Sequence, residues 1–500
     1  MKAPILFRKP ACLVAVLLSF PLVTRSQLIS VRSVPVAAAE QFLLTPSQNL
    51  GMGSVSIAVP DPSLDPFINP AKGARIRGAY LFSSPVFSSI TEENGGIRSL
   101  PFGALVGSKT WFGGLNLAVQ KHNERNNRGA RSITRPDDIW RNTGIILADE
   151  NKNNTYAAGL IGKKLPGTNL SIAASVSWAE LEAMQGGDFL YSFNSHLVQY
   201  GHLEDYRLGL LQEGSSQPSF ELLLLHNRIK MTHDLYRRLW IREGDFINPQ
   251  LSTILERNLD QTNTWGLHAG ITTPMAREGG RAGFIFTVNL KSHPKIPNYE
   301  IMNIPRDPGT TWAFNFGAGL ANEKGPSVAA VDFIFEPIWS HTWAEAAEPT
   351  TTRGGENIPA GGKTVENYFR FSNGLVRLGL SGQENNFGFQ LGLQGRLINY
   401  RLKQTDFIAG TRRTQKEFWA EWTPSIGFNL DFPAFQIRYS GMMTIGTGQP
   451  GVNFVESAMA DARSNGSNFI VAPAGRLTLQ DAIVLTHQFS LVIALQALMH

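Results

Sequence analysis

Cysteine is almost absent from this sequence. Among 500 residues there is a single cysteine, Cys12, and it lies inside a leader that we expect to be removed. The mature chain would then have neither a disulfide nor a metal-binding pair of cysteines. Such an exported chain must be stabilised by packing and backbone pairing alone.

We identify residues 1–26 as the leader. Lys2, Arg8 and Lys9 precede the apolar run "ACLVAVLLSFPLV", and the polar "TRSQ" follows it. This order is typical of a secretory signal peptide, and we predict cleavage after Ser26; the alternative at 37–40 lies too far beyond the apolar run. Cys12 lies at the very start of the apolar run, whereas a lipoprotein cysteine would follow it, so we expect no lipid anchor.

The chain also lacks long apolar runs and a charge of one sign. Beyond the leader there is no stretch of about 18 apolar residues, which argues against membrane helices. The 45 lysines and arginines include four in the leader, so the mature charge is close to balanced against 40 acidic residues. We therefore predict no nucleic-acid partner. If the chain enters a membrane, it does so as strands.

What the sequence has instead is the period of β-strands. In "WAFNFGAGL", residues 312–320, every even position is apolar and every odd position is small or polar. The same alternation recurs in 169–178, 331–343, 387–394, 418–430 and 483–495. The second faces carry Gly, Ser, Asn, Gln, Ala and Thr, which suits a wet interior, and the bulky faces often end on tryptophan, as interfacial girdles do. The bulky face is thus predicted to meet lipid.

Connections between these segments alternate between short and long. Tight turns such as "LPGT" and "ANEKGP" separate longer polar stretches, which are 123–152, 183–195, 236–261, 296–309, 346–364, 405–413 and 449–482. Short periplasmic turns and long external loops are typical of outer-membrane barrels. We predict an all-β fold, a transmembrane antiparallel up-and-down β-barrel of 14–16 strands over 74–500, with both termini periplasmic. Phase slips near Asn373 and Leu397 predict bulges, and Pro337 requires a bulge or an unpaired position.

Residues 27–73, between leader and barrel, contain two short motifs. Gly51, Met52 and Gly53 precede a valine-containing stretch and two aspartates, and the region ends on Asn69, Pro70 and Ala71. In this region the chain resembles the outer-membrane transporters of hydrophobic compounds, the FadL, OmpP1 and TodX-like barrels, and the related PorV-type proteins. It departs from their pattern at Lys72, where glycine is usual, and at Ser54, which replaces a third glycine.

The resemblance implies a 14-stranded barrel whose N-terminal segment folds inside the lumen as a hatch. Hydrophobic ligand would enter from the external loops, bind in the lumen and leave sideways into the bilayer. A sideways exit needs a gap in the wall, and Gly113 and Gly114 in one strand are the candidate gate. The alternative for the N-terminal segment is an ordinary periplasmic linker, because Gly and Pro are frequent in loops.

Charged residues on the second faces are predicted to line the lumen. The carboxylates Asp332, Glu336 and Glu421 could bind a cationic group, but we expect them to pair with Arg377, Arg396 or Arg438, because barrel interiors are routinely charged. An enzyme would need a nucleophile and a base within reach, and nothing in the sequence places such a set together. His226 and His233 are seven apart and thus lie on opposite strand faces, so they cannot share a metal without a bulge. We expect no metal, no cofactor and no enzymatic activity.

Two functions remain for such a barrel. The first is passive transport of hydrophobic small molecules, similar to long-chain fatty acids, across a bacterial outer membrane, with membrane lipid and the ligand as its partners. The second is a PorV- or PorP-like role, in which the external loops hold proteins of a secretion machine. A transporter should have an apolar pocket near residues 40–73, and a scaffold a filled lumen and an exposed apolar patch on its loops.

Overall fold

The computed structural model describes residues 28–495, except for 30, 34, 36, 92–94, 125–149, 185–195, 215–216, 242–249, 277, 294–308, 347 and 451–478. The predicted leader, including the cleavage position after Ser26, lies outside the described residues.

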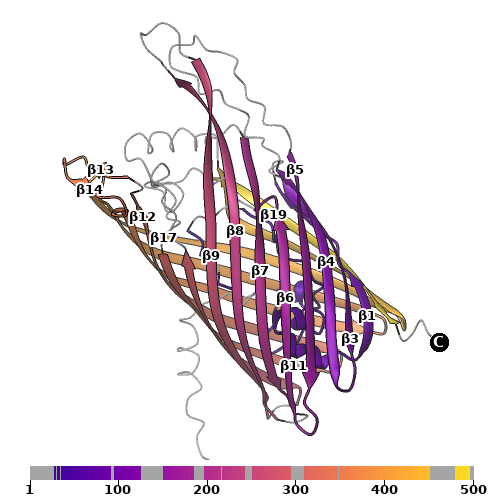
Figure 1. The fold of residues 1–500 in the computed structure, drawn as a ribbon. Helices are drawn as coiled ribbons and strands as arrows, with labels where there is room; N and C mark the ends of the chain where they lie inside the picture. Colours follow the sequence, from indigo (N-terminus) through magenta and orange to yellow (C-terminus); the bar gives the residue numbers. More distant parts are fainter. Residues whose placement is uncertain are drawn as a thin grey trace, which may run out of the picture.

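The described strands form one closed antiparallel barrel (Figure 1). Its strands are β1 (Gly78–Ser83), β2 (Val86–Ile90), β3 (Gly96–Gly107), β4 (Trp111–Glu124), β5 (Glu150–Lys164), β6 (Leu170–Leu181), β7 (His196–Gln212), β8 (Ser219–Ile241), β9 (Gln250–Pro274), β10 (Gly280–His293), β11 (Gly309–Lys324), β12 (Ser327–Glu345), β15 (Lys363–Glu384), β16 (Phe387–Asp406), β17 (Thr411–Asp431), β18 (Phe435–Pro450) and β19 (Leu479–Ala494). β1 and β2 are two parts of a single strand, since both pair with β3 and with β19 in one continuous register. The barrel thus has 16 strands, the upper end of the predicted range, and the pairing of the first strand with β19 closes it.

The two faces of the wall differ as the alternation predicts. On β11, Trp312, Phe316 and Leu320 are each almost half exposed, whereas Ala313 and Asn315 between them are buried. Large apolar side chains are exposed on the same outward face of strand after strand, and small or polar side chains are buried on the inward face. The predicted transmembrane barrel with bulky residues outside is confirmed, since only lipid makes such an outer surface favourable.

Short turns gather at one end of the barrel, which we call the turn end; the opposite end is the loop end. The turn end contains the links 108–110, 165–169, 325–326, 385–386 and 432–434. Two predicted loops at the loop end are wrong. Residues 407–410 form a short link, and most of 236–261 is strand, because β8 and β9 pair as far as Ile241 opposite Gln250. These long strands rise above the rest of the barrel (Figure 1). Beyond the bilayer both faces of a strand meet water, so the alternation that marks a strand is lost while its backbone pairing continues.

Backbone pairing lapses at a few places in the wall. Between β11 and β12 it skips Glu336 and Pro337, which confirms the predicted unpaired position at a residue without an N–H. Between β15 and β16 it skips Ser372 and Asn373 and resumes in the same register, so the bulges predicted near Asn373 and Leu397 are wrong. The described register shifts lie instead at Ala344/Glu345 and at Thr444/Thr447. A small two-stranded sheet, β13 (Thr350–Thr351) with β14 (Asn357–Ile358), occupies the link between β12 and β15.

The N-terminal segment, residues 28–77, lies within the barrel rather than beside it, as its indigo coil shows (Figure 1). It contains the 3-10 turns η1 (Leu50–Met52) and η2 (Pro70–Arg75) and the single helical turn α2 (Asp65–Ile68). Wall side chains donate hydrogen bonds to its carbonyl groups from several sides of the lumen, namely Asn116 and Gln120 of β4, Arg207 of β7, Gln390 of β16 and Gln488 of β19. Among the described residues, no helix is long and apolar enough to cross a membrane.

Candidate ligand site inside the barrel

The Gly51–Met52–Gly53 turn lies against the inward face of the wall. Gly53 has φ +65° and Ser54 has φ +62°, a left-handed conformation that favours glycine. A Cβ on Gly51 would lie 2.6 Å from Cα of Gly427 on β17, and Met52 itself is 2% exposed. The two glycines are therefore required by close approach of two backbones as well as by the turn.

The wall has glycines where this turn meets it. Added Cβ atoms on Gly379 of β15 and Gly392 of β16 would overlap Met52 and Gly53. Ser425 of β17 completes the contact, since its Oγ donates to the carbonyl oxygen of Gly51 and accepts from the N–H of Gly53, both at 3.0 Å. We call Gly379, Gly392, Gly427 and Ser425 the glycine seat.

Residues 56–57 are held by one of the predicted lumen carboxylates. Asp332 of β12 accepts the N–H of Ser56 at 2.7 Å, and Arg377 of β15 lies 3.6 Å from Asp332 and donates to Ser56 Oγ at 3.1 Å. Both charged residues are 1% exposed. Asp332 and Arg377 therefore hold the N-terminal segment in place, because the Asp332 carboxylate accepts a backbone N–H of that segment.

Asn69 and Pro70 begin η2 and connect it to the opposite wall. The Asn69 side chain accepts the N–H of Ala71 at 3.2 Å, which caps the turn, and donates to Glu221 of β8 at 3.0 Å. Pro70 occupies a first-turn position, where its missing N–H costs no hydrogen bond. Behind Asn69 is Gly209 of β7, where an added Cβ would overlap the Asn69 amide.

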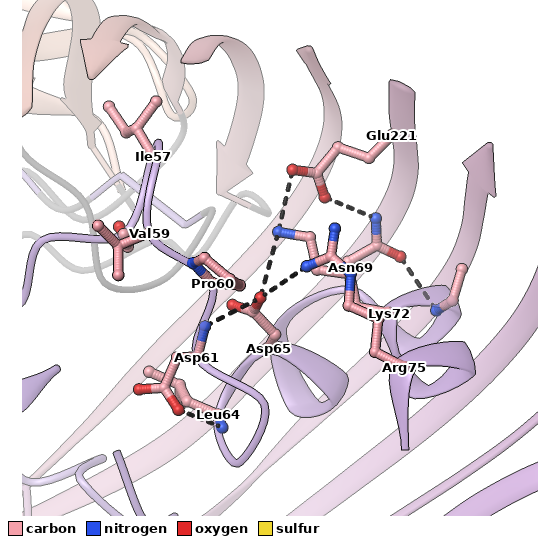
Figure 2. A network of polar contacts seen from close by, with 12 residues as sticks. Ile57, Val59, Pro60, Asp61, Leu64, Asp65, Asn69, Lys72, Arg75 and Glu221 are labelled. Atoms are coloured by element: carbon pink, nitrogen blue, oxygen red, sulfur yellow. Dashed lines mark hydrogen bonds and ion pairs between the residues drawn. The ribbon is translucent and has the colours of Figure 1, made fainter. Parts of the chain in front are cut away.

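Four charged residues surround this turn (Figure 2). Lys72 Nζ lies 3.0 Å from Glu221 and 3.9 Å from Asp65, and Arg75 contacts Asp65 at 3.2 Å. We call Asp65, Asn69, Lys72, Arg75 and Glu221 the polar seat. Lys72, which departs from the family pattern, is thus the cation that neutralises a wall carboxylate. Burial raises the pKa of Asp65 to about 6, even though Lys72 and Arg75 pull it down.

Asp61 shapes the chain between the two seats. Its carboxylate accepts Ser47 Oγ and the N–H of Gln48, both at 2.7 Å, and also the N–H of Leu64 at 3.1 Å. One buried side chain therefore closes the loop of the N-terminal segment that runs from η1 to α2.

A cavity remains between this loop and the wall of β8–β10. Its apolar lining comes from Val55, Ile57, Leu64, Ile68 and Ile285, and its polar lining includes Asp61, Asp65, Lys72, Glu221 and His268. The space open to the centres of water molecules is about 70 Å³, well above the roughly 10–15 Å³ that a cavity needs to hold a water. The cavity is amphiphilic, with an apolar wall and a charged end at the polar seat.

The remaining lumen charges are placed as follows. Glu421 of β17 contacts Arg32 of the N-terminal segment at 2.8 Å and Arg396 of β16 at 3.8 Å. Glu336 is buried and accepts Asn373 Nδ2 at 3.3 Å. Arg438 lies on β18, and the described ion pairs include none that joins it to these carboxylates.

Gly113 and Gly114, the candidate lateral gate, lie in an unbroken part of the wall. Both pair with β3 and with β5 in register, opposite Val106 and Leu105 and opposite Ile161 and Leu160. A Cβ on Gly114 would lie 2.5 Å from Leu105 Cδ2, so this glycine accommodates a neighbouring side chain.

The sequence did not point to Glu221, Arg207 or the glycine seat. Lys72, which replaces the glycine of the family pattern, could have indicated such a partner, because a lysine buried in a lumen requires a carboxylate beside it. Nothing local marks Glu221 as that carboxylate, because the two are 149 positions apart. Among the described residues, no group of three His, Cys, Asp or Glu side chains is arranged to hold a metal ion.

Comparison with known proteins gives structural matches only. No protein-family model and no curated protein matches the sequence. Solved structures that are similar include a FadL homologue from Pseudomonas aeruginosa, with 10% identity, a TM-score of 0.42 and coverage of 92% of this chain and 99% of that one. The toluene transporter TodX from Pseudomonas putida has 11% identity, a TM-score of 0.37 and coverage of 89% and 96%.

CdiB from Acinetobacter baumannii is also similar, with 8% identity, a TM-score of 0.40 and coverage of 93% of this chain and 74% of that one. The similar structures include a FadL homologue and TodX, and the N-terminal motifs resemble the FadL and TodX-like family. This chain has 16 strands, not the 14 that the resemblance implies. Its strand pairing and its outward apolar face identify it as a barrel of the outer-membrane type.

Proposed function

We propose that the chain carries hydrophobic small molecules, similar to long-chain fatty acids, passively through its lumen, and that the N-terminal segment acts as a hatch. The observation that supports this is the amphiphilic cavity at residues 47–72, the region where a transporter was expected to have a pocket. Its apolar wall suits a hydrocarbon chain and its charged end suits a polar group. The barrel would lie in a bacterial outer membrane with both termini in the periplasm.

A hatch must move before ligand can pass, so fastening it to the wall tests the proposal. In the double variant N69C/G209C, sulfur would replace Asn69 Cγ, which lies 3.2 Å from a Cβ placed on Gly209. This is close to the separation of a sulfur from the far Cβ across a disulfide. The mature chain has no other cysteine, so the tether is specific.

The measurement is uptake of radiolabelled oleate by Gram-negative cells that produce the protein. We expect the protein to raise uptake, the oxidised double variant to abolish the increase, and a reductant to restore it. The reduced double variant is the matched control, because it carries the same substitutions without the tether. Uptake that is equal with the tether closed and open would reject a moving hatch, and uptake that the protein does not raise would reject transport.

The competing function is a scaffold for a secretion machine. It is favoured by the extent to which the N-terminal segment fills the lumen, with contacts to β4, β7, β8, β12 and β15–β19. Co-purification of a secretion complex with the protein, together with unchanged oleate uptake, would favour this role over transport.

Sideways exit of ligand through Gly113 and Gly114 is a separate part of the proposal. The variant G113V/G114V would fill both positions with side-chain atoms. Uptake of oleate should fall if ligand leaves there, and unchanged uptake would place the exit elsewhere.

A further inference from the structure

The outer face of β15, β16 and β17 carries several exposed cations near the loop end, and four of them lie next to one another. Arg370 of β15 pairs in register with Arg401 of β16, and Arg401 pairs with Lys416 of β17. Lys403 is the next outward residue on β16. We call Arg370, Arg401, Lys403 and Lys416 the basic patch. Side chains directly opposite in antiparallel strands have Cβ atoms about 4.5–5.5 Å apart, so three of these cations stand in one row across three strands.

Such a row is unfavourable in the isolated protein. Like charges directly opposite each other destabilise a sheet, and no described side chain forms an ion pair or hydrogen bond with any of the four cations. The nearby outward carboxylate Glu366 is already engaged by Lys363, His341 and Tyr368. The patch therefore has a positive charge that nothing in the described chain balances.

The position of the basic patch along the wall indicates which groups neutralise its charge. On β16 the outward residues are apolar or glycine from Phe387 to Leu397, and Asn399, Arg401 and Lys403 follow. At the usual tilt of such barrels this apolar stretch spans about 25 Å, the height of the lipid-facing band. Trp339, 54% exposed, pairs in register with Arg370 and marks the interface. The patch thus begins where hydrocarbon ends and lipid headgroups start.

We propose that the basic patch binds the phosphate groups of lipid headgroups in the leaflet at the loop end. Guanidinium groups match phosphate bidentately, and ammonium groups add point charge. In an outer membrane whose loop end faces outward, this lipid is the phosphorylated glycolipid of the outer leaflet. The site is on the outer wall, and it is independent of the lumen and of transport.

The test measures lipid A retained by the purified barrel in native mass spectrometry. The variant R401Q/K416Q removes two adjacent cations of the row. Each basic group near an anionic lipid surface contributes about 1 kcal/mol, so we expect the affinity to fall roughly tenfold or more. The matched control is R228Q/K230Q on β8, which removes the same charge at a place where Arg228 already faces Glu204 across the strands.

Three further measurements decide whether the proposal holds. Both variants should keep the heat-modifiable migration of a folded barrel, and the control should bind lipid A as the unchanged protein does. With chemically dephosphorylated lipid A, the difference between R401Q/K416Q and the unchanged protein should vanish. Equal retention by both variants, a difference that persists without the phosphates, or displacement of the lipid by millimolar inorganic phosphate would overturn the proposal.

Discussion

At residues 51–53 the N-terminal segment meets β15–β17 through glycine against glycine. At residues 69–75 it meets β7 and β8 through amide and charged side chains, and Ala71 packs into an apolar cluster of the wall. The glycine seat is a fit of backbone shapes, and any added atom breaks it. The polar seat is a set of charge-assisted bonds that borders a cavity, and water can replace such bonds. If part of the N-terminal segment moves to admit a ligand, the polar seat is the end that releases, and the glycine seat is the anchor.

The glycine seat should be broken most severely by a single methyl group. In Gly392→Ala the new Cβ would overlap backbone atoms of Met52 and Gly53, which no rotamer can avoid. We expect a loss of about 3 kcal/mol, the upper end of the usual cost of overpacking. Hydrogen exchange of the peptide 44–60 should rise sharply, while exchange in the wall strands stays low.

The matched control is Gly382→Ala on the same sheet. An added Cβ there would meet only Ser327 Oγ at 3.9 Å. Similar exchange in the two variants would show that the glycine seat does not anchor the segment.

Removing a charge from the polar seat should destabilise the N-terminal segment less than Gly392→Ala does, and only near the polar seat. Glu221→Gln keeps the size of the side chain but removes the charge that neutralises Lys72, which retains only the more distant Asp65. We expect the seat to weaken by about 1–2 kcal/mol, within the range of hydrogen bonds to charged groups. Exchange should increase over residues 61–77 and remain unchanged over 44–60.

Glu213→Gln is the control for this variant. Glu213 also contacts Arg75, but its side chain is 40% exposed, so its loss should cost little. An increase over 44–60 in Glu221→Gln would contradict the separation of the two seats.

The effect of acidity should be no larger than that of the glycine seat, and it should be confined to the polar seat. The pKa of Asp65 lies at about 6 in the folded chain against 3.8 for a free side chain. The folded segment therefore binds the Asp65 proton more tightly than a free side chain does. The stability that Asp65 contributes to the folded segment decreases as the pH rises from about 4 to about 6. Residues 61–77 should be better protected at pH 4.5 than at pH 7, after correction for intrinsic exchange.

Asp65→Asn should remove this dependence, because its side chain stays neutral throughout. Protection of residues 44–60 should be the same at both pH values. A dependence that persists in the variant would assign the titration to another group.

The sequence predicted the wall better than the contents of the lumen. Alternation in 312–320 placed Trp312 and Phe316 outside correctly, because the period of a strand is local and survives any register. The long loop at 236–261 was predicted wrongly, since strands that leave the bilayer lose alternation but keep their pairing. The motifs at 51–53 and 69–71 marked the two points of contact in the N-terminal segment, but nothing local identified the wall residues that receive them.

The sequence by itself determined that this chain forms strands with one face for lipid, tight turns at one end, and an N-terminal segment with two conformationally special sites. The tertiary structure alone decided the closure at 16 strands and the depth of each residue along the wall. That depth brings Gly392 to Gly53, Glu221 to Lys72, and Arg401 beside Arg370 and Lys416. Register and closure arise from the pairing of all strands together, so contacts that depend on them cannot be read from any local pattern.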